Sequence, residues 1–161
     1  MSKTKVIAFA NNKGGSGKTT TCSNVACALA LEGKKVLMID GDMQLNLTIA
    51  YFDEDSALSF AENNKTIYNA VTQNVDLKQC IHQTSFEGLD LIPSSSLMSG
   101  IEFELFTKWQ RETVLKKCLE PVKALGYYDY ILIDAPPTLG GWVMNVLVAS
   151  DYVVIPVEAS P

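Results

Sequence analysis

The stretch Lys13-Gly14-Gly15-Ser16-Gly17-Lys18-Thr19-Thr20 decides the fold of this chain. It follows an apolar run at residues 6–10 and precedes a helix-like segment at residues 20–31. A strand, a glycine-rich loop and a helix in this order form a phosphate-binding loop, because glycines let backbone N–H groups close around phosphate oxygens. The helix N-terminus adds partial positive charge there. We therefore expect Lys18 to reach the β- and γ-phosphates and the Thr19 hydroxyl to bind Mg²⁺.

The loop departs at one position from the usual Gly-x-x-x-x-Gly-Lys-Ser/Thr pattern, because Asn12 occupies the place of the first glycine. It also has an additional lysine, Lys13, at its start. This deviant Walker A motif resembles that of the ParA/MinD family of ATPases. The resemblance implies that Lys13 reaches across a dimer interface to the partner's nucleotide; the alternative is a solvated loop charge. It also implies that ATP is bound by Lys13, Gly14, Gly15, Ser16, Gly17, Lys18, Thr19 and Thr20.

A second motif follows the apolar run at residues 36–39, in the order Asp40-Gly41-Asp42-Met43-Gln44-Leu45-Asn46-Leu47-Thr48. It resembles the Walker A′ motif of the same family, with Met43 in place of the usual proline. The resemblance implies that Asp42 orients the attacking water and that Asp40 supports the metal site. A carboxylate suits the first role because it accepts a hydrogen bond from the water. The alternative is an Asx-type turn after a strand.

A third motif is the apolar run at residues 130–133 followed by Asp134-Ala135-Pro136-Pro137-Thr138-Leu139-Gly140. A strand that ends in aspartate is the Walker B pattern, in which Asp134 holds Mg²⁺, typically through a water. Thr138 replaces the serine that the family commonly has. Gly140 and Gly141 would let this segment move with the γ-phosphate, as switch loops do. A plain rigid turn is the competing interpretation.

Strands and helices alternate along the chain in the way that builds a parallel sheet. The pattern predicts strands at 5–10, 35–39, 79–84, 89–92, 130–133 and 152–155, and helices at 20–31, 66–72, 97–106 and 109–125. The expected fold is therefore α/β, of the P-loop NTPase type, with a mostly parallel sheet flanked by helices on both faces. The three motifs would then meet at the carboxyl ends of the strands.

The predicted core includes several aromatic residues and one amphipathic helix. The last two strand runs are apolar enough to be covered on both faces. Helical spacing places Leu115, Cys118, Leu119, Val122 and Leu125 on one stripe, and Pro121 is expected to kink or restart the helix. The aromatic residues are not interleaved with basic ones, as a platform for stacking nucleic-acid bases would be. We therefore assign core and strand packing to five of them: Trp109, Trp142, Tyr127, Tyr128 and Tyr130.

Composition favours one intracellular domain over residues 1–161, with 47% hydrophobic and 19% charged residues. No apolar run reaches the roughly 20 residues that span a bilayer, and the start of the chain does not resemble a secretory signal. We therefore predict a cytoplasmic protein without membrane attachment. The cysteine spacing indicates reduced, core-filling thiols rather than a metal site or disulfides. His82 has no acid or thiol beside it and is interpreted as structural.

Net charge argues mildly against a nucleic-acid surface within this sequence. The formal net charge is −5, whereas non-specific DNA binding depends on clustered Lys and Arg. The densest basic group is interspersed with two acidic residues, Glu112 and Glu120, so we interpret it as a solvated helix face. Its members are Lys108, Arg111, Lys116, Lys117 and Lys123.

The resemblance extends over the whole chain and is closer to the ParA/Soj branch, on the Gln44 and Asn46 pattern and the Pro-Pro after Asp134. Relatives are typically longer, so we expect a truncated N-terminal portion, in which DNA-binding and adenine-contacting regions are mostly absent. The resemblance implies a slow ATPase and an ATP-dependent homodimer. A ParB-type centromere-binding protein would stimulate it, and non-specific DNA would hold it on the nucleoid during plasmid or chromosome partition.

Three alternatives stay open at this point. A MinD-like ATPase that cycles on a membrane needs a C-terminal amphipathic helix. An iron–sulfur carrier or reductase needs interface cysteines at metal-ligand spacing, which this sequence does not supply. A nucleotide-dependent scaffold would bind ATP without hydrolysing it, and the presence of Asp42 and Asp134 argues against that alternative.

Overall fold

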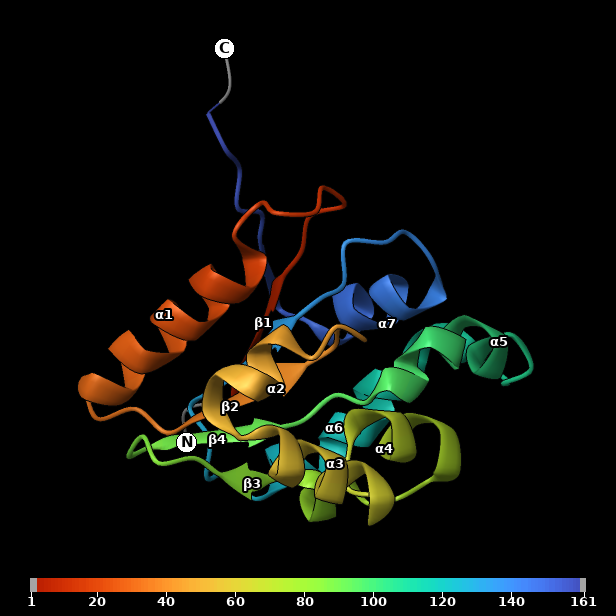
Figure 1. The fold of residues 1–161 in the computed structure, drawn as a ribbon, viewed down its shortest axis with the longest axis horizontal. Coiled ribbons are helices and arrows are strands. Elements are labelled where there is room, and N and C mark those ends of the chain that lie inside the picture. Colours follow the sequence, from red (N-terminus) through yellow and green to blue (C-terminus); the bar gives the residue numbers. More distant parts are fainter. Residues whose placement is uncertain (1–2, 160–161) are drawn as a thin grey trace.

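A six-stranded sheet with strand order β3-β4-β2-β5-β1-β6 forms the centre of the computed structural model, which describes residues 3–159 (Figure 1). Strand β3 runs antiparallel to β4, and the other neighbouring strands are parallel. The strands are β1 (Lys5–Phe9), β2 (Val36–Asp40), β3 (His82–Gln83), β4 (Leu89–Ile92), β5 (Tyr130–Asp134) and β6 (Tyr152–Val154). This arrangement confirms the predicted α/β fold with a mostly parallel sheet.

Helices lie on both faces of the sheet, and each face has its own apolar core (Figure 1). The helices are α1 (Lys18–Leu31), α2 (Asn46–Tyr51), α3 (Glu54–Glu62), α4 (Ile67–Gln73), α5 (Ile101–Phe106), α6 (Val114–Ala124) and α7 (Gly141–Ala149). Short 3₁₀ turns are η1 (Leu77–Cys80), η2 (Ser96–Gly100) and η3 (Arg111–Thr113). Helices α1 and α2 pack on one face, and α4 to α7 pack on the other.

Strand alternation divides the two cores. Val6, Ala8, Ile131 and Ile133 point toward α4 to α7, whereas Leu132 points toward α1 and α2. Successive side chains of a strand face opposite sides, so a strand covered on both faces is apolar throughout. Strands β2 and β5 are consequently buried on both faces, and for β5 this confirms the prediction.

Three helices lie where the sequence predicted no helix, namely α2, α3 and α7. Helix α2 follows Leu45, which has φ of 57° and provides no side-chain cap, so no cap residue marks its start. Helix α3 does have a cap signal, because the Asp53 side chain accepts the Ser56 N–H at 2.7 Å and Glu54 and Asp55 occupy the first turn. The predicted strand at 79–84 is too long, because Gln79 and Cys80 belong to 3₁₀ turn η1 and strand β3 covers only His82–Gln83.

The predicted burial of several residues is wrong at the edges of the fold. Strand β6 lies at the end of the sheet beside β1, so Tyr152 and Val153 are exposed rather than covered on both faces. Trp109 is 86% exposed and Tyr127 is 54% exposed, whereas Trp142 and Tyr128 are buried as predicted. Trp109 precedes η3 rather than lying within the helix.

Helix α6 begins later than predicted and tolerates its proline. It continues past Pro121 to Ala124, although the proline has no N–H for the intrahelical ladder. Leu115, Leu119 and Val122 are buried, as the helical stripe predicts. Leu125 is 54% exposed, because it lies beyond the helix end at the C-cap.

The cysteines and the histidine have the structural surroundings that the sequence indicates. All four cysteines are free, with Cys22 and Cys80 buried. His82 stacks on Phe60 with ring centroids 3.8 Å apart. Within residues 3–159, no helix is both long and apolar enough to cross a membrane.

The difference between Leu119 and Leu125 gives a direct test of the packing. Leu119→Ala removes a fully buried side chain and is expected to lower the free energy of unfolding by roughly 2–5 kcal/mol. Leu125→Ala is the matched control and should change it by no more than about 0.5 kcal/mol. Urea denaturation followed by circular dichroism measures both values. Equal losses in the two variants would contradict the placement of α6.

Candidate functional site

The phosphate loop connects β1 to α1 and has the backbone geometry of an anion cradle. Gly15 and Gly17 have φ of 72° and 83°, a region that glycine enters without strain. Gly17 is the N-cap of α1 and provides no side-chain hydrogen bond. The first-turn N–H groups of α1 are therefore not occupied by a cap and are directed at the loop. Helix α1 begins at Lys18, two residues earlier than the sequence predicts. The N-terminal partial charge of α1 therefore falls inside the loop.

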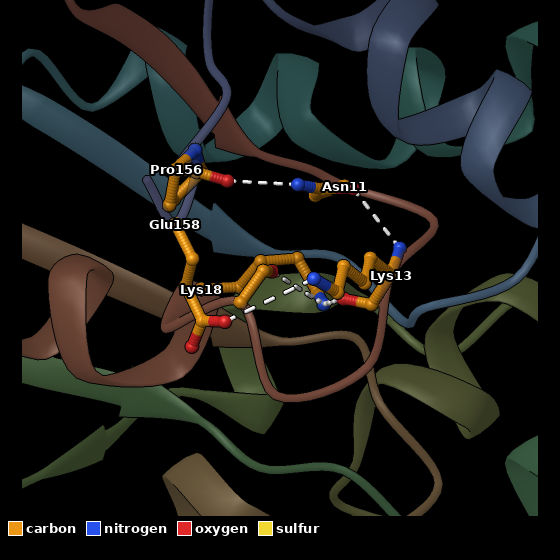
Figure 2. Close-up of polar contacts among 6 residues, drawn as sticks. Asn11, Lys13, Lys18, Pro156 and Glu158 are labelled. Atoms are coloured by element: carbon orange, nitrogen blue, oxygen red, sulfur yellow. Dashed lines mark hydrogen bonds and ion pairs between the residues drawn. The ribbon is translucent and has the colours of Figure 1, made fainter. Parts of the chain in front are cut away.

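Lys18 is buried and folds back over this loop. Its Nζ donates to the Lys13 carbonyl oxygen at 3.3 Å and lies 3.5 Å from the Ser16 Oγ (Figure 2). A buried ammonium group is costly unless it is paired, and the loop oxygens partly satisfy it. The ammonium group is therefore available for an anion that enters the loop.

Lys13 occupies a different environment from Lys18. Its side chain is 63% exposed and its Nζ lies 3.9 Å from Oε2 of Glu158. Asn11 fixes the loop start, because its Oδ1 accepts the Lys13 N–H at 2.9 Å and its Nδ2 donates to the Pro156 carbonyl at 2.8 Å (Figure 2). An exposed ion pair of this kind is weak, so the Lys13 side chain can leave Glu158 at little cost.

The carboxylates of Asp40 and Asp134 end two adjacent strands at paired positions of the sheet. Asp40 is completely buried, and both of its oxygens are used within the chain. Its Oδ1 accepts the Asp42 N–H at 3.1 Å, and its Oδ2 accepts the Thr48 N–H at 2.8 Å and hydroxyl at 2.7 Å. Asp40 therefore holds the loop that carries Asp42, and its predicted support of a metal site stays a prediction.

Asp134 lies opposite the first turn of α1. Its Oδ2 accepts the Thr19 hydroxyl at 2.6 Å. Its Oδ1 is buried and has no hydrogen-bond partner among the described residues. A buried carboxylate oxygen without a partner is unfavourable, and a divalent cation would satisfy it. The Thr19 and Asp134 pair therefore fits the Mg²⁺ that the phosphate loop implies.

Burial and neighbouring charges raise the pKa of both carboxyl groups. Burial raises the pKa of Asp40 to about 6, against the lowering effect of its hydrogen bonds. Burial, with the charges of Asp40 and Asp42, raises the pKa of Asp134 to about 7, although Thr19 and Lys18 lower it. A divalent cation at this end of the sheet would favour the charged form of these carboxyl groups and so lower their pKa values.

Asp42 lines the same space from the loop after β2. It is 7% exposed, and its Oδ1 accepts the Gln44 N–H at 3.1 Å. A cavity of about 370 Å³ separates this loop from the phosphate loop. It is lined by Gly14, Gly15, Ser16, Gly17, Lys18, Thr19, Thr20, Asp42, Gln44, Asn46 and Pro137.

The structure thus brings most of the predicted site residues together around one cavity. Lys13 lies outside the lining, and Asp40 and Asp134 lie beneath it. Gln44, Asn46 and Pro137 line the cavity but were not among the predicted site residues, although they belong to the motifs at residues 40–48 and 134–140. No three His, Cys, Asp or Glu side chains form a metal cluster within the described part of the chain.

The fold and this cavity define a P-loop nucleotide-binding domain with a deviant phosphate loop. Residues 4–161 match a family model described as an AAA domain (AAA_31), and the chain belongs to that family. It is 43% identical over 154 residues to the sporulation initiation inhibitor protein Soj of Bacillus subtilis (strain 168). The match covers 96% of this chain and 58% of Soj, and confirms the resemblance to ParA/Soj-type ATPases.

Two solved structures are similar in fold. The chain matches cobyrinic acid a,c-diamide synthase from Mycobacterium smegmatis with bound ADP and magnesium, at TM-score 0.86 and 32% identity. It matches a plasmid partition protein from Borrelia burgdorferi B31 bound to AMPPNP, at TM-score 0.80 and 34% identity. The matches cover 96% of this chain and 60% and 62% of those chains. This chain therefore spans about 60% of the length of these similar proteins.

The raised pKa of Asp134 predicts a pH-dependent stability in the absence of divalent cations. The folded state binds a proton at a pKa of about 7, against 3.8 for an ordinary solvated aspartate. The folded state therefore holds more protons between these values, and its stability increases as pH falls from 8 to 6 and is lost as pH rises through 7. The gain should be roughly 1 kcal/mol.

Urea denaturation at pH 8 and pH 6, with wild type and Asp134→Asn, measures this contribution. The variant shares all other titrating groups, including His82, so the difference between the two proteins isolates Asp134. We expect the pH-dependent gain in wild type to exceed that in Asp134→Asn. Parallel curves would contradict the environment assigned to this carboxyl group.

Proposed function

We propose that this chain is the nucleotide-binding part of an ATP-driven dimerisation switch that serves DNA partition. The observation that carries the proposal is the Thr19–Asp134 pair, with an orphaned carboxylate oxygen, directly beside the phosphate loop. The similarity to Soj and to a plasmid partition protein supports the assignment to partition. The ligands are ATP and Mg²⁺, which fit the loop and the carboxylate respectively.

Phosphate binding uses groups that the structure already directs at the loop. Lys18 would exchange the Lys13 carbonyl and Ser16 hydroxyl for phosphate oxygens, which are better partners for an ammonium group. The first-turn N–H groups of α1 would bind the same phosphates. Thr19 and Asp134 would hold Mg²⁺, which supplies neutralisation of phosphate charge.

Hydrolysis requires a group that orients water at the terminal phosphate. Asp42 lines the cavity opposite the phosphate loop, and its Oδ1 is held by the Gln44 N–H. Its Oδ2 makes no hydrogen bond among the described residues and can accept one from water. Asp40 would set the position of Asp42 by accepting its backbone N–H. Asp42 is therefore the water-positioning residue in this proposal.

Dimerisation is assigned to Lys13. Its exposed side chain and weak contact with Glu158 leave it able to reach a nucleotide in a second subunit. Such an interaction exists only while the partner's phosphates are bound, so loss of the γ-phosphate would weaken the dimer. In this proposal the protein hydrolyses ATP slowly, and a ParB-type partner stimulates the hydrolysis. The dimer binds non-specific DNA on the nucleoid.

Removal of the Lys13 charge tests the dimerisation switch. We expect ATP and Mg²⁺ to convert wild-type monomer into dimer, and Lys13→Ala to stay monomeric, in size-exclusion chromatography with light scattering. Lys34→Ala is the control, because it removes another exposed lysine that lies outside the phosphate loop. A Lys13→Ala protein that dimerises like wild type would contradict the assigned role.

Removal of the Asp42 carboxylate separates an ATPase from a non-hydrolysing scaffold. We expect Asp42→Ala to retain ATP binding but to lower turnover by at least about 100-fold, the scale of general acid–base assistance. Phosphate release over time measures turnover, and nucleotide titration measures binding. Equally slow turnover in wild type and variant would favour a scaffold. ATP-dependent binding to lipid vesicles would instead favour the membrane-cycling alternative.

A further inference from the structure

Helix α7 has no side-chain cap from its own segment, and its first N–H groups are instead bound by the carboxylate of Glu102 in α5. Gly140 caps the helix and provides no side-chain hydrogen bond. Glu102, in α5, accepts the Gly141 N–H at 2.8 Å through Oε2 and the Trp142 N–H at 3.1 Å through Oε1. These are charge-assisted hydrogen bonds at a helix N-terminus, where negative charge is favourable.

The approach of Glu102 depends on glycine at the start of α7. A Cβ on Gly140 would lie 2.6 Å from Oε1 of Glu102, and a Cβ on Gly141 would lie 3.1 Å from Oε2. Helix α5 itself is fixed by the buried side chains of Ile101 and Leu105, which flank Glu102. The carboxylate therefore ties the first turn of α7 to a part of the fold that is packed in the core.

The first turn of α7 also contacts the loop after β2, which is itself bonded to the Asp134 backbone. The Trp142 indole N–H donates to the Gly41 carbonyl at 2.9 Å. Gly41 in turn donates its N–H to the Asp134 carbonyl at 2.9 Å, and a Cβ at Gly41 would lie only 2.7 Å from that oxygen. Trp142 is buried, and its hydrogen bond to Gly41 couples the position of its side chain to the loop that holds Asp42.

A second cavity of about 400 Å³ lies between α5, the loop after β2 and the segment after β5. Glu102 and Trp142 line it, and it shares Asp42, Gln44 and Pro137 with the phosphate cavity. The segment at residues 135–140 thus runs from Asp134 past both cavities to the turn that Glu102 holds.

We propose that Glu102 is a positioning residue that fixes the first turn of α7, and through it the 135–140 segment and the Asp42 loop, so that the site distinguishes ATP from ADP. The proposal rests on the nucleotide binding given above as the proposed function. Without the carboxylate, the two N–H groups would be solvated, and the segment next to the terminal phosphate would lose its fixed end. Contacts of the phosphate loop with ADP would be unaffected.

The test compares affinities for ADP and for the non-hydrolysable analogue AMPPNP, each with Mg²⁺, by calorimetry. Glu102→Ala should lower the preference for AMPPNP over ADP by about tenfold, the scale of one lost charge-assisted hydrogen bond, while ADP affinity stays within about threefold. Glu104→Ala is the matched control on the same helix, since its side chain makes no hydrogen bond in the described structure. It should leave both affinities unchanged.

A second variant reaches the same contact without altering Glu102. Gly140→Ala places a methyl group where the carboxylate lies, so it should reproduce the loss of preference. Trp142 provides a spectroscopic readout in a Trp109→Phe background, because these are the two tryptophans of the chain. Trp142 emission should respond to AMPPNP more than to ADP, and this difference should disappear in Glu102→Ala.

The outcomes separate the two proposals. An unchanged AMPPNP preference in Glu102→Ala, in a protein that binds both nucleotides, would overturn the positioning role and leave the proposed function standing. Parallel loss of both affinities together with a lower melting temperature would also overturn it, because a merely structural cap behaves in that way. If wild type binds ADP and AMPPNP equally, the positioning role of Glu102 is wrong. If wild type binds neither nucleotide, both the positioning role and the proposed function are wrong.

Discussion

The hydrogen bond from the Thr19 hydroxyl to the Asp134 carboxylate, 2.6 Å long, is the contact on which the site depends. It joins the first turn of α1 to the end of β5, two elements that lie more than 100 residues apart in sequence. Parallel pairing of β1 and β2 with β5 places the ends of these strands together. The phosphate loop, the Asp42 loop and the 135–140 segment therefore leave the sheet at one edge, as is general for α/β nucleotide sites.

The same edge gathers three carboxyl groups, those of Asp40, Asp42 and Asp134, in a place where water is largely excluded. Asp40 meets this constraint with three donors from its own loop and helix, whereas Asp134 keeps one buried oxygen without a partner among the described residues. The difference assigns them different tasks. Asp40 organises the chain around itself, and in the proposed function Asp134 would bind the cation that arrives with the nucleotide.

The loop at residues 13–20 could be predicted from sequence because its residues are contiguous and their backbone requirements are local. The sheet could be predicted as well, because buried parallel strands are continuous apolar runs. Helices α2, α3 and α7 were missed. Helices α2 and α7 begin without a local side-chain cap, whereas the Asp53 cap and the acidic first turn of α3 are a local signal that could have indicated it. The cap of α7 comes from Glu102, a contact between distant segments that no local pattern encodes. Trp109 and Leu125 were misplaced because helical spacing does not show where a helix starts and ends.

The central claim is that the loop at residues 13–20 binds nucleotide phosphates through Lys18 and the N-terminus of α1. Calorimetric titration of wild type and Lys18→Ala with Mg²⁺ and ATP is its most direct test. The account predicts one nucleotide per chain in wild type, and an affinity at least about 100-fold lower in Lys18→Ala, because the variant loses the cation that faces the phosphates. Equal affinities, or no binding by wild type, would contradict it.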